Sequence, residues 1–435
     1  MKYEVKEVEL ANGAKGLLVD VKGAKVMRFS LGFMGGTLLC PPDKPEIAHA
    51  LEHMVLKANE VYREEKDFVM EVCKNGADLN AATGGHDIQY IASCADFEWE
   101  RVLKLLTLAI SKPLLSAEHF KTEMKVISEE LTGHLDNYAR IIGMEIIKAC
   151  RGIDLVPEKR VKLLDNLDLE DLKRFYARTH FAANMRFVIV GDLTGKEKAL
   201  KALLTDWELG EGAGKRFSRV HPPFQSVEAP VVVDNRAAGK MYFELNVSKG
   251  DGRPLSFEER VSLSVIHELL IGSGGYSLAS RINGQARERG LTYGIGSSWD
   301  SLDSELDFGG SVERTNAPAL LELVAREVRR VLDGGLSDKE LRDIKRRLAG
   351  GYSRKELSTA RLINHYEEYI IHHEDETYED YDMYEKMLPA ITREQVLDTY
   401  RRFFSSGKWC FGLLGADPAA IAGELYGQVG SIFKA

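Results

Sequence analysis

An internal repeat constrains the fold of this chain more than any other feature of its sequence. Residues 163–193 (LLDNLDLEDLKRFYARTHFAANMRFVIVGDL) align without a gap with residues 387–417 (MLPAITREQVLDTYRRFFSSGKWCFGLLGAD). At this one offset the matched pairs are Leu164 and Leu388, Leu167 and Ile391, Glu170 and Glu394, Leu172 and Val396, Tyr176 and Tyr400, Arg178 and Arg402, and Gly191 and Gly415. Each copy predicts a capped amphipathic helix, a short connection and a strand that ends in glycine. Chance reuse of a common helix-to-strand unit is the alternative, but the gapless match favours two homologous halves.

The stretch between the two copies predicts where the halves are joined. Residues 210–223 (GEGAGKRFSRVHPP) are rich in glycine, basic residues and proline and show no periodicity, as is typical of a linker. A chain of 435 residues also exceeds what one hydrophobic core usually organises. We therefore expect an N-terminal half over residues 1–209 and a C-terminal half over residues 224–435.

The order of strand and helix patterns predicts the fold class. Strand patterns often follow one another without an intervening helix, which favours antiparallel pairing. We expect an α+β fold whose two homologous halves each contain a mainly antiparallel sheet flanked by helices. The predicted strands include Val26–Phe33, Asp87–Cys94, Arg186–Val190 and Met241–Val247, and the predicted helices include Phe97–Ala109, Ala117–His134, Pro318–Leu332 and Asp338–Glu356.

Composition excludes several classes of protein. The chain is 44% apolar and 29% charged, which is ordinary for a globular protein, and it has no apolar run long enough to span a membrane. A net charge of −9 argues against a general nucleic-acid binder. The five scattered cysteines form no C-x-x-C pair, and the N-terminus lacks the apolar segment of a secretory signal. These features predict a cytoplasmic protein that binds neither nucleic acid nor membranes.

The stretch HALEH (residues 49–53) has the spacing of a metal site. On a helix, His49 and His53 share one face, so two imidazoles can enter one tetrahedral zinc shell. Glu52 lies beside that face, where it can reach water at the metal without being a ligand. This H-x-x-E-H pattern is the inverse of the H-E-x-x-H metallopeptidase motif. The alternative is an amphipathic helix with two ordinary histidines, and a third ligand would decide between these interpretations.

The predicted helix over residues 123–131 (EMKVISEEL) offers three glutamates as that third ligand. Glu123 and Glu130 share a helix face, whereas Glu129 points elsewhere. Taken alone, the segment is typical of a solvated, charged helix face.

Together these segments closely resemble the pitrilysin/insulinase family, which includes the mitochondrial processing peptidases. Its members carry H-x-x-E-H followed later by a segment like E-R-x-V-x-x-E-[ILM]. The resemblance implies that Glu130 is the third zinc ligand, with Glu129 as the alternative, and that Glu123 supports the ligands from outside the metal shell. Glu46 departs from the family, which usually has glycine here. It is either a tolerated surface change or an additional carboxylate near the site.

Two further segments resemble the substrate-binding elements of the family. In residues 75–94 (NGADLNAATGGHDIQYIASC), Asn80, Ala81 and Thr83 match the element that pairs with extended substrate backbone. In residues 273–299 (SGGYSLASRINGQARERGLTYGIGSSW), Arg287 and Tyr293 match the pair that grips substrate near the scissile bond. Their spacing is one residue shorter than usual, so that Arg289 is the alternative to Arg287.

The resemblance spans essentially the whole chain and implies a zinc metalloendopeptidase with about one zinc ion per chain. Three protein ligands leave a position for water, Glu52 is the general base, and Tyr293 and Arg287 help to stabilise the oxyanion. Short members of the family dimerise around a chamber that admits unstructured peptides. The resemblance therefore implies peptide substrates and a homodimer, or a heterodimer with a related chain. The alternative function is that of a non-catalytic partner subunit, because some relatives have lost the metal site.

Overall fold

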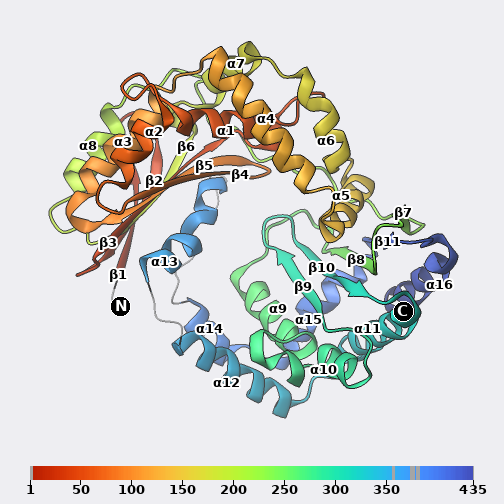
Figure 1. Cartoon of the computed structure of the whole chain (residues 1–435). Coiled ribbons are helices and arrows are strands. Elements are labelled where there is room, and N and C mark those ends of the chain that lie inside the picture. The colour runs from red at the N-terminus through yellow and green to blue at the C-terminus, as the bar shows by residue number, and fades with distance from the viewer. Residues whose placement is uncertain (1–2, 355–357, 373–377, 379–382, 435) are drawn as a thin grey trace. The chain divides into compact units, whose positions relative to one another are not determined.

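The computed structural model describes residues 3–354, 358–372, 378 and 383–434. The chain divides into two compact units, each drawn from several stretches of sequence (Figure 1). Unit 1 comprises Met1–Thr132, Glu158–Val220 and Glu356–Tyr381. Unit 2 comprises Gly133–Pro157, His221–Lys355 and Asp382–Ala435.

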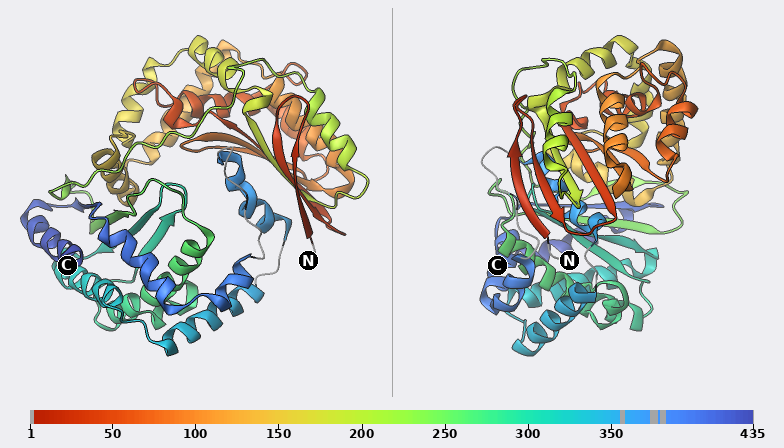
Figure 2. Two further views of the ribbon diagram at one scale, coloured as in Figure 1. Left: turned by 180° about the vertical axis from the view of Figure 1, so that it is seen from behind. Right: turned by 90° about the vertical axis from the view of Figure 1, so that its left-hand side faces the viewer.

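Unit 1 is built on a six-stranded sheet with the order β1-β2-β6-β3-β5-β4. Its strands are β1 (Tyr3–Glu9), β2 (Lys15–Val21), β3 (Val26–Met34), β4 (Asp78–Thr83), β5 (Asp87–Ala95) and β6 (Met185–Gly191). Only β2 and β6 pair in parallel, and the other neighbours are antiparallel. The N-terminal strands β1 and β2 run side by side in both views of Figure 2.

Helices cover both faces of this sheet. The helices of unit 1 are η1 (Thr37–Leu39), α1 (Ile47–Lys57), α2 (Glu65–Cys73), η2 (Asp96–Glu98), α3 (Trp99–Ser111), α4 (Ala117–Gly133), α6 (Pro157–Leu163), η3 (Leu164–Asn166), α7 (Leu169–Thr179), η4 (Ala182–Asn184), α8 (Glu197–Asp206), α13 (Thr359–Tyr366) and η7 (Glu367–Ile371). Helices α1 and α3 pack on β4 and β5, whereas α13 and η7 contact β3 and β6 from the opposite face (Figure 1). A Cβ atom on Gly32 of β3 would lie 2.1 Å from Ile370 of η7, so this close approach requires glycine.

The described strands of unit 2 repeat the arrangement of unit 1, with no counterpart of β1 among them. Its sheet order is β7-β11-β8-β10-β9, with β7 and β11 parallel and the other neighbours antiparallel. The strands are β7 (Val231–Asp234), β8 (Met241–Ser248), β9 (Ile295–Asp300), β10 (Glu305–Val312) and β11 (Trp409–Gly415). The helices are α5 (Tyr138–Arg151), α9 (Phe257–Leu270), η5 (Gly274–Ala279), α10 (Arg281–Glu288), η6 (Arg314–Asn316), α11 (Ala317–Leu332), α12 (Asp338–Arg354), α14 (Met383–Ala390), α15 (Arg393–Ser405), α16 (Ala419–Gly430) and η8 (Ser431–Phe433).

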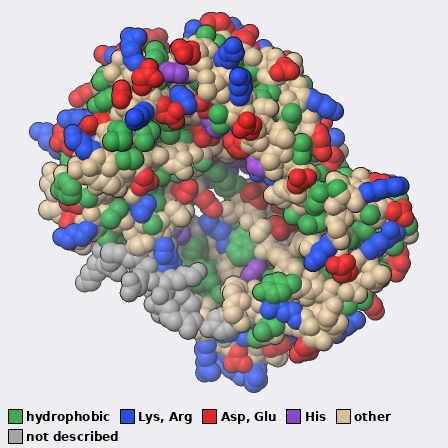
Figure 3. All heavy atoms as spheres, in the orientation of Figure 1, with side chains coloured by type: hydrophobic (Ala, Val, Ile, Leu, Met, Phe, Trp, Pro, Cys, Tyr) green, Lys and Arg blue, Asp and Glu red, His purple; other side chains and the backbone are tan. Residues whose placement is uncertain are grey.

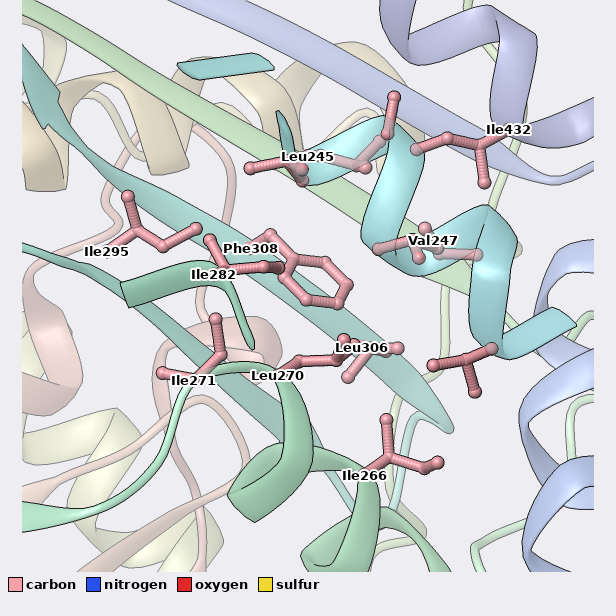
Figure 4. Packing of buried hydrophobic residues seen from close by; sticks show 14 of the residues in the cluster. Leu245, Val247, Ile266, Leu270, Ile271, Ile282, Ile295, Leu306, Phe308 and Ile432 are labelled. Carbon is pink, nitrogen blue, oxygen red and sulfur yellow. The ribbon is translucent and has the colours of Figure 1, made fainter. Parts of the chain in front are cut away.

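Two apolar layers enclose the sheet of unit 2. On one face, Leu245 and Val247 of β8 and Phe308 of β10 lie in one buried cluster with side chains of α9, including Ile266 and Leu270 (Figure 4). On the other face, α5 packs on β8 and β11 through Ile142, Ile146 and Cys150, which lie in one buried cluster with Cys410 and Leu414. Burial of apolar side chains on both faces explains why the strands of this sheet are rich in hydrophobic residues.

The structure confirms the predicted α+β class and the two homologous halves. Strands β6 and β11 begin and end at matching positions of the repeat, and the helices before them, α7 and α15, start at matching positions. Both helices begin with a capping box, made by Asp168 and Asp171 in one copy and by Thr392 and Gln395 in the other. The strands and helices predicted from periodicity are all present, with ends shifted by one or two residues where the structure describes them.

The units are not simply the two halves of the sequence. The boundary between Val220 and His221 falls inside the predicted linker 210–223. However, the segment Gly133–Pro157, which carries α5, belongs to unit 2, and the segment Glu356–Tyr381, which carries α13 and η7, belongs to unit 1. Each half of the sequence therefore supplies a helix that covers the sheet built mainly from the other half.

The surface carries charges of both signs. On the face shown in Figure 3, acidic and basic side chains are interspersed over the described residues. Within the part of the chain that the structure describes, no helix is both long enough and apolar enough to cross a membrane.

A carboxyl group in unit 2 gives a test of the packing on the face covered by α5. Burial, together with the nearby charges of Asp307 and Glu305, raises the pKa of Glu244 on β8 to about 7. Because the folded state holds this proton more tightly than the unfolded state, stability is lost as the pH rises from about 4.5 to above 7. We expect Glu244→Gln to raise the melting temperature at pH 8 by about 2–4 °C. The gain should shrink toward zero as the pH is lowered to 4 in thermal unfolding, and the exposed Glu322→Gln should show no gain at either pH.

Candidate metal centre

Helix α1 presents His49, Glu52 and His53 on its half-buried side because its apolar residues bury the other side. Ile47, Ala48, Ala50, Leu51, Met54 and Val55 are all buried in the core of unit 1. The imidazole rings of His49 and His53 lie one turn apart, with centroids 4.8 Å from each other and planes nearly perpendicular at 82°. Their Nε2 atoms are 3.2 Å apart. The predicted helical pairing of the two histidines is therefore present.

Helix α4 brings Glu130 to the same point. A carboxylate oxygen of Glu130 lies 3.4 Å from Nε2 of His49 and 3.7 Å from Nε2 of His53. One ligand atom from each of these three residues lies within 4.8 Å of the other two. Glu129, the alternative ligand, is exposed and is not a member of this group. Two imidazole nitrogens and one carboxylate oxygen form a donor set that suits zinc, so the residues present fit the metal that the sequence predicts.

The Nδ1 atom of each histidine contacts a carboxylate. The Nδ1 atom of His49 lies 3.0 Å from Oε2 of Glu46, and the Nδ1 atom of His53 lies 3.0 Å from Oε2 of Glu123. Hydrogen bonds at both Nδ1 atoms leave both Nε2 atoms free to bind a metal. Glu123 therefore occupies the supporting position that the resemblance implies.

The two supporting carboxylates are each paired with a cation. Arg160 of α6 donates to both oxygens of Glu46 through Nε and Nη2, and Nζ of Lys57 lies 2.7 Å from Oε1 of Glu123. Burial alone would raise the pKa of Glu46 and of Glu123, but their hydrogen bonds and neighbouring positive charges lower both values. Both groups are therefore carboxylates at neutral pH, able to accept a proton-bearing nitrogen. Sequence reasoning missed Arg160 and Lys57, because neither belongs to a recognisable motif.

Glu52 is held next to the histidines without joining the metal group. Its Oε2 atom accepts a hydrogen bond of 2.8 Å from Oγ1 of Thr83 on β4. Strand β4 also carries Asn80 and Ala81, and among the described residues it pairs only on one side, with β5, because it is the last strand of the sheet. The predicted general base and the predicted substrate strand thus lie in direct contact.

Arg287 and Tyr293 lie in unit 2 and contact each other. Nε of Arg287 on α10 donates to the backbone oxygen of Tyr293, and its guanidinium carbon lies 4.3 Å from the centre of the tyrosine ring. The side chain of Tyr293 is 85% exposed, which leaves its hydroxyl available to a ligand. Arg289 is the C-cap residue of α10 and is exposed. The structure therefore pairs Tyr293 with Arg287 rather than with the alternative arginine.

This chain has two related α+β units, and its H-x-x-E-H helix faces a helix that carries a glutamate. These features together define a class of metallopeptidase-like proteins. Two family models match this chain: "Insulinase (Peptidase family M16)" over residues 19–153 and "Peptidase M16 inactive domain" over residues 166–348. The chain belongs to this pitrilysin/insulinase family.

Curated relatives match one part of the chain. It is 27% identical over 129 residues to the insulin-degrading enzyme of Mus musculus, covering 30% of this chain and 13% of that protein. It is 25% identical over 130 residues to the A-factor-processing enzyme of Saccharomyces cerevisiae, covering 30% of this chain and 13% of that protein. The aligned part of the chain thus spans only a small fraction of the length of either relative.

Solved structures match the whole fold. A protease from Helicobacter pylori superposes with a TM-score of 0.80 at 17% identity, covering 95% of this chain and 100% of that one. A "peptidase M16 inactive domain" from Pseudomonas fluorescens has a TM-score of 0.78 at 18% identity, covering 95% of this chain and 98% of that one. At these identities the likeness confirms the fold.

Proposed function

We propose that this protein is a zinc-dependent endopeptidase that hydrolyses unstructured peptides, with Glu52 as its general base. The observation that carries the proposal is the convergence of His49, His53 and Glu130, whose ligand atoms lie within 4.8 Å of one another. These three residues and Glu52 all lie in residues 19–153, which match the insulinase model, and not in the stretch that matches the inactive-domain model.

His49, His53 and Glu130 would hold the zinc ion. When bound, zinc supplies a Lewis acid that favours a water nucleophile near neutral pH and polarises the peptide carbonyl. Glu52 takes a proton from the water that attacks the carbonyl carbon. The same carboxyl group then returns the proton to the leaving amine as the C–N bond breaks, which yields a new carboxylate and a new amine. Thr83 orients Glu52 for both transfers through its hydrogen bond.

The outer edge of β4, which pairs with no other strand among the residues that the structure describes, supports an extended peptide as the substrate. A peptide can add to this edge as a further strand, using backbone hydrogen bonds that do not depend on its side chains. Asn80, Ala81 and Thr83 would then border the substrate next to Glu52. This mode of binding gives loose sequence preference. Arg287 and Tyr293 are proposed to grip the substrate near the scissile bond, and the active protein is proposed to be a homodimer or a heterodimer with a related chain.

Zinc content and peptide hydrolysis, measured on one preparation, test the proposal. Purified protein is expected to contain about one zinc ion per chain and to cleave a mixture of unstructured peptides at many different sequences. A chelator should abolish cleavage, and stoichiometric zinc should restore it. Protein that holds zinc but cleaves none of the peptides would instead support the alternative function, that of a non-catalytic partner subunit.

A further inference from the structure

Glu46 occupies an unusual position at the start of the metal-binding helix. It is the N-cap residue of α1, yet its side chain makes no hydrogen bond to the backbone of that helix. The carboxylate instead reaches Nδ1 of His49, at 3.0 Å, and the guanidinium group of Arg160 on α6. Glu46 is 0% exposed, so it is an additional carboxylate at the site and not a tolerated surface change.

A fully buried carboxylate is costly unless it is paired and hydrogen-bonded. Arg160 meets this need with two parallel N–H donors, which fix the plane of the carboxylate as well as its charge. Oε2 of Glu46 lies 3.0 Å from Nδ1 of His49. An arginine from α6 and a histidine on α1 thus contact the same carboxylate.

His53 is also hydrogen-bonded by a carboxylate, which comes from a different segment of the chain. His53 contacts Glu123, and Glu123 pairs with Lys57. Glu123 lies in the segment that the family shares, whereas Glu46 stands where family members usually have glycine. The contacts of Glu46 with His49 and Arg160 therefore give the site of this chain a second supporting carboxylate beside Glu123.

We infer that Glu46 and Arg160 form a positioning pair that orients His49 and so raises the affinity of this protein for zinc. The inference rests on the proposed zinc site. Partners of this kind outside the metal shell change metal affinity by about 10–100-fold. The pair does not touch the reacting atoms, so its effect should appear in metal binding by protein without substrate.

The zinc dissociation constant, measured by competition with a chromophoric chelator, tests this role. Glu46→Ala is expected to weaken binding by about 10–100-fold. Glu46→Gln should weaken it less, because the amide oxygen can still accept from Nδ1. Arg160→Lys keeps the positive charge but loses the fork of donors, so it should also weaken binding. It should have no further effect in a Glu46→Gln background, because the pair acts as one unit.

Matched variants separate positioning from a general loss of structure. Arg174→Lys changes an arginine that pairs with Asp171 on α7, outside the site, and should bind zinc like the parent protein. Glu46→Gln is isosteric, so it carries the test if Glu46→Ala does not fold. Parent-like zinc affinity in both Glu46→Gln and Arg160→Lys would overturn the inference while leaving the proposed peptidase intact. Failure of the parent protein itself to bind zinc would overturn both.

Discussion

Replacing Glu52 by glutamine is expected to reduce the turnover number for peptide hydrolysis at least about a hundredfold, the lower end of the usual contribution of a general base. Glutamine keeps the shape of the side chain and can still contact Thr83, but it cannot take a proton from water. Because Glu52 lies outside the group of ligand atoms, the zinc content of the variant should equal that of the parent protein. Turnover and zinc content should be measured on the same sample.

A nearby glutamate provides the control for this variant. Glu60 is exposed and follows the end of α1, so Glu60→Gln should retain both activity and zinc. Loss of zinc from Glu52→Gln would mean that this residue is a ligand, and retention of full turnover would remove it from the chemistry. Either result would require a different assignment of roles within the motif.

Replacing His53 by alanine is expected to lower zinc affinity by more than about a hundredfold, beyond the effect of residues that only support a ligand. Two remaining ligands bind the metal poorly, and the hydrolytic activity should disappear with it. Zinc content after dialysis and activity in a large excess of zinc should be compared. Partial return of activity at high zinc would show that His53 acts through metal binding rather than through the stability of the fold.

Two adjacent glutamates on α4, Glu129 and Glu130, allow zinc content to identify which of them is the third ligand. Glu130→Gln should lose zinc, because its carboxylate faces both Nε2 atoms, whereas the exposed Glu129→Gln should retain it. The two variants differ by one position on the same helix and carry the same change in charge. The reverse result would show that Glu129 is the ligand, the alternative that the sequence leaves open.

Much of the fold was predictable because it depends on local patterns. The repeat at 163–193 and 387–417 indicated two related halves, and its helix and strand recur as α7 with β6 and α15 with β11. Strand periodicity located β3, β5 and β8 within one or two residues. It could not show on which sheet an amphipathic helix would pack. For that reason α5 and α13 were not assigned to the unit that each of them joins.

The candidate site was predictable where spacing within one helix fixes geometry. His49, Glu52 and His53 followed from positions on a single helix, and the family pattern then selected Glu130. The position of Thr83 against Glu52 and that of Arg160 against Glu46 depend on tertiary contacts between segments distant in sequence. Sequence reasoning left Glu46 undecided between a surface residue and a site residue. Its complete burial beside a paired cation resolves that question.

The exchange of helices between the two halves of the sequence affects where this chain can be divided. The position of the linker 210–223 suggests that the chain could be divided there into two proteins of similar length, each with its own sheet. The N-terminal piece would include α5 but would lack the sheet on which α5 packs. It would also lack α13 and η7, so the face of β3 and β6 that these helices cover would be exposed. The C-terminal piece would lack α5, so the apolar surface around Cys410 and Leu414 would be exposed. A cut within residues 210–223 is therefore expected to leave each piece with an uncovered sheet face, although this stretch joins the two homologous halves.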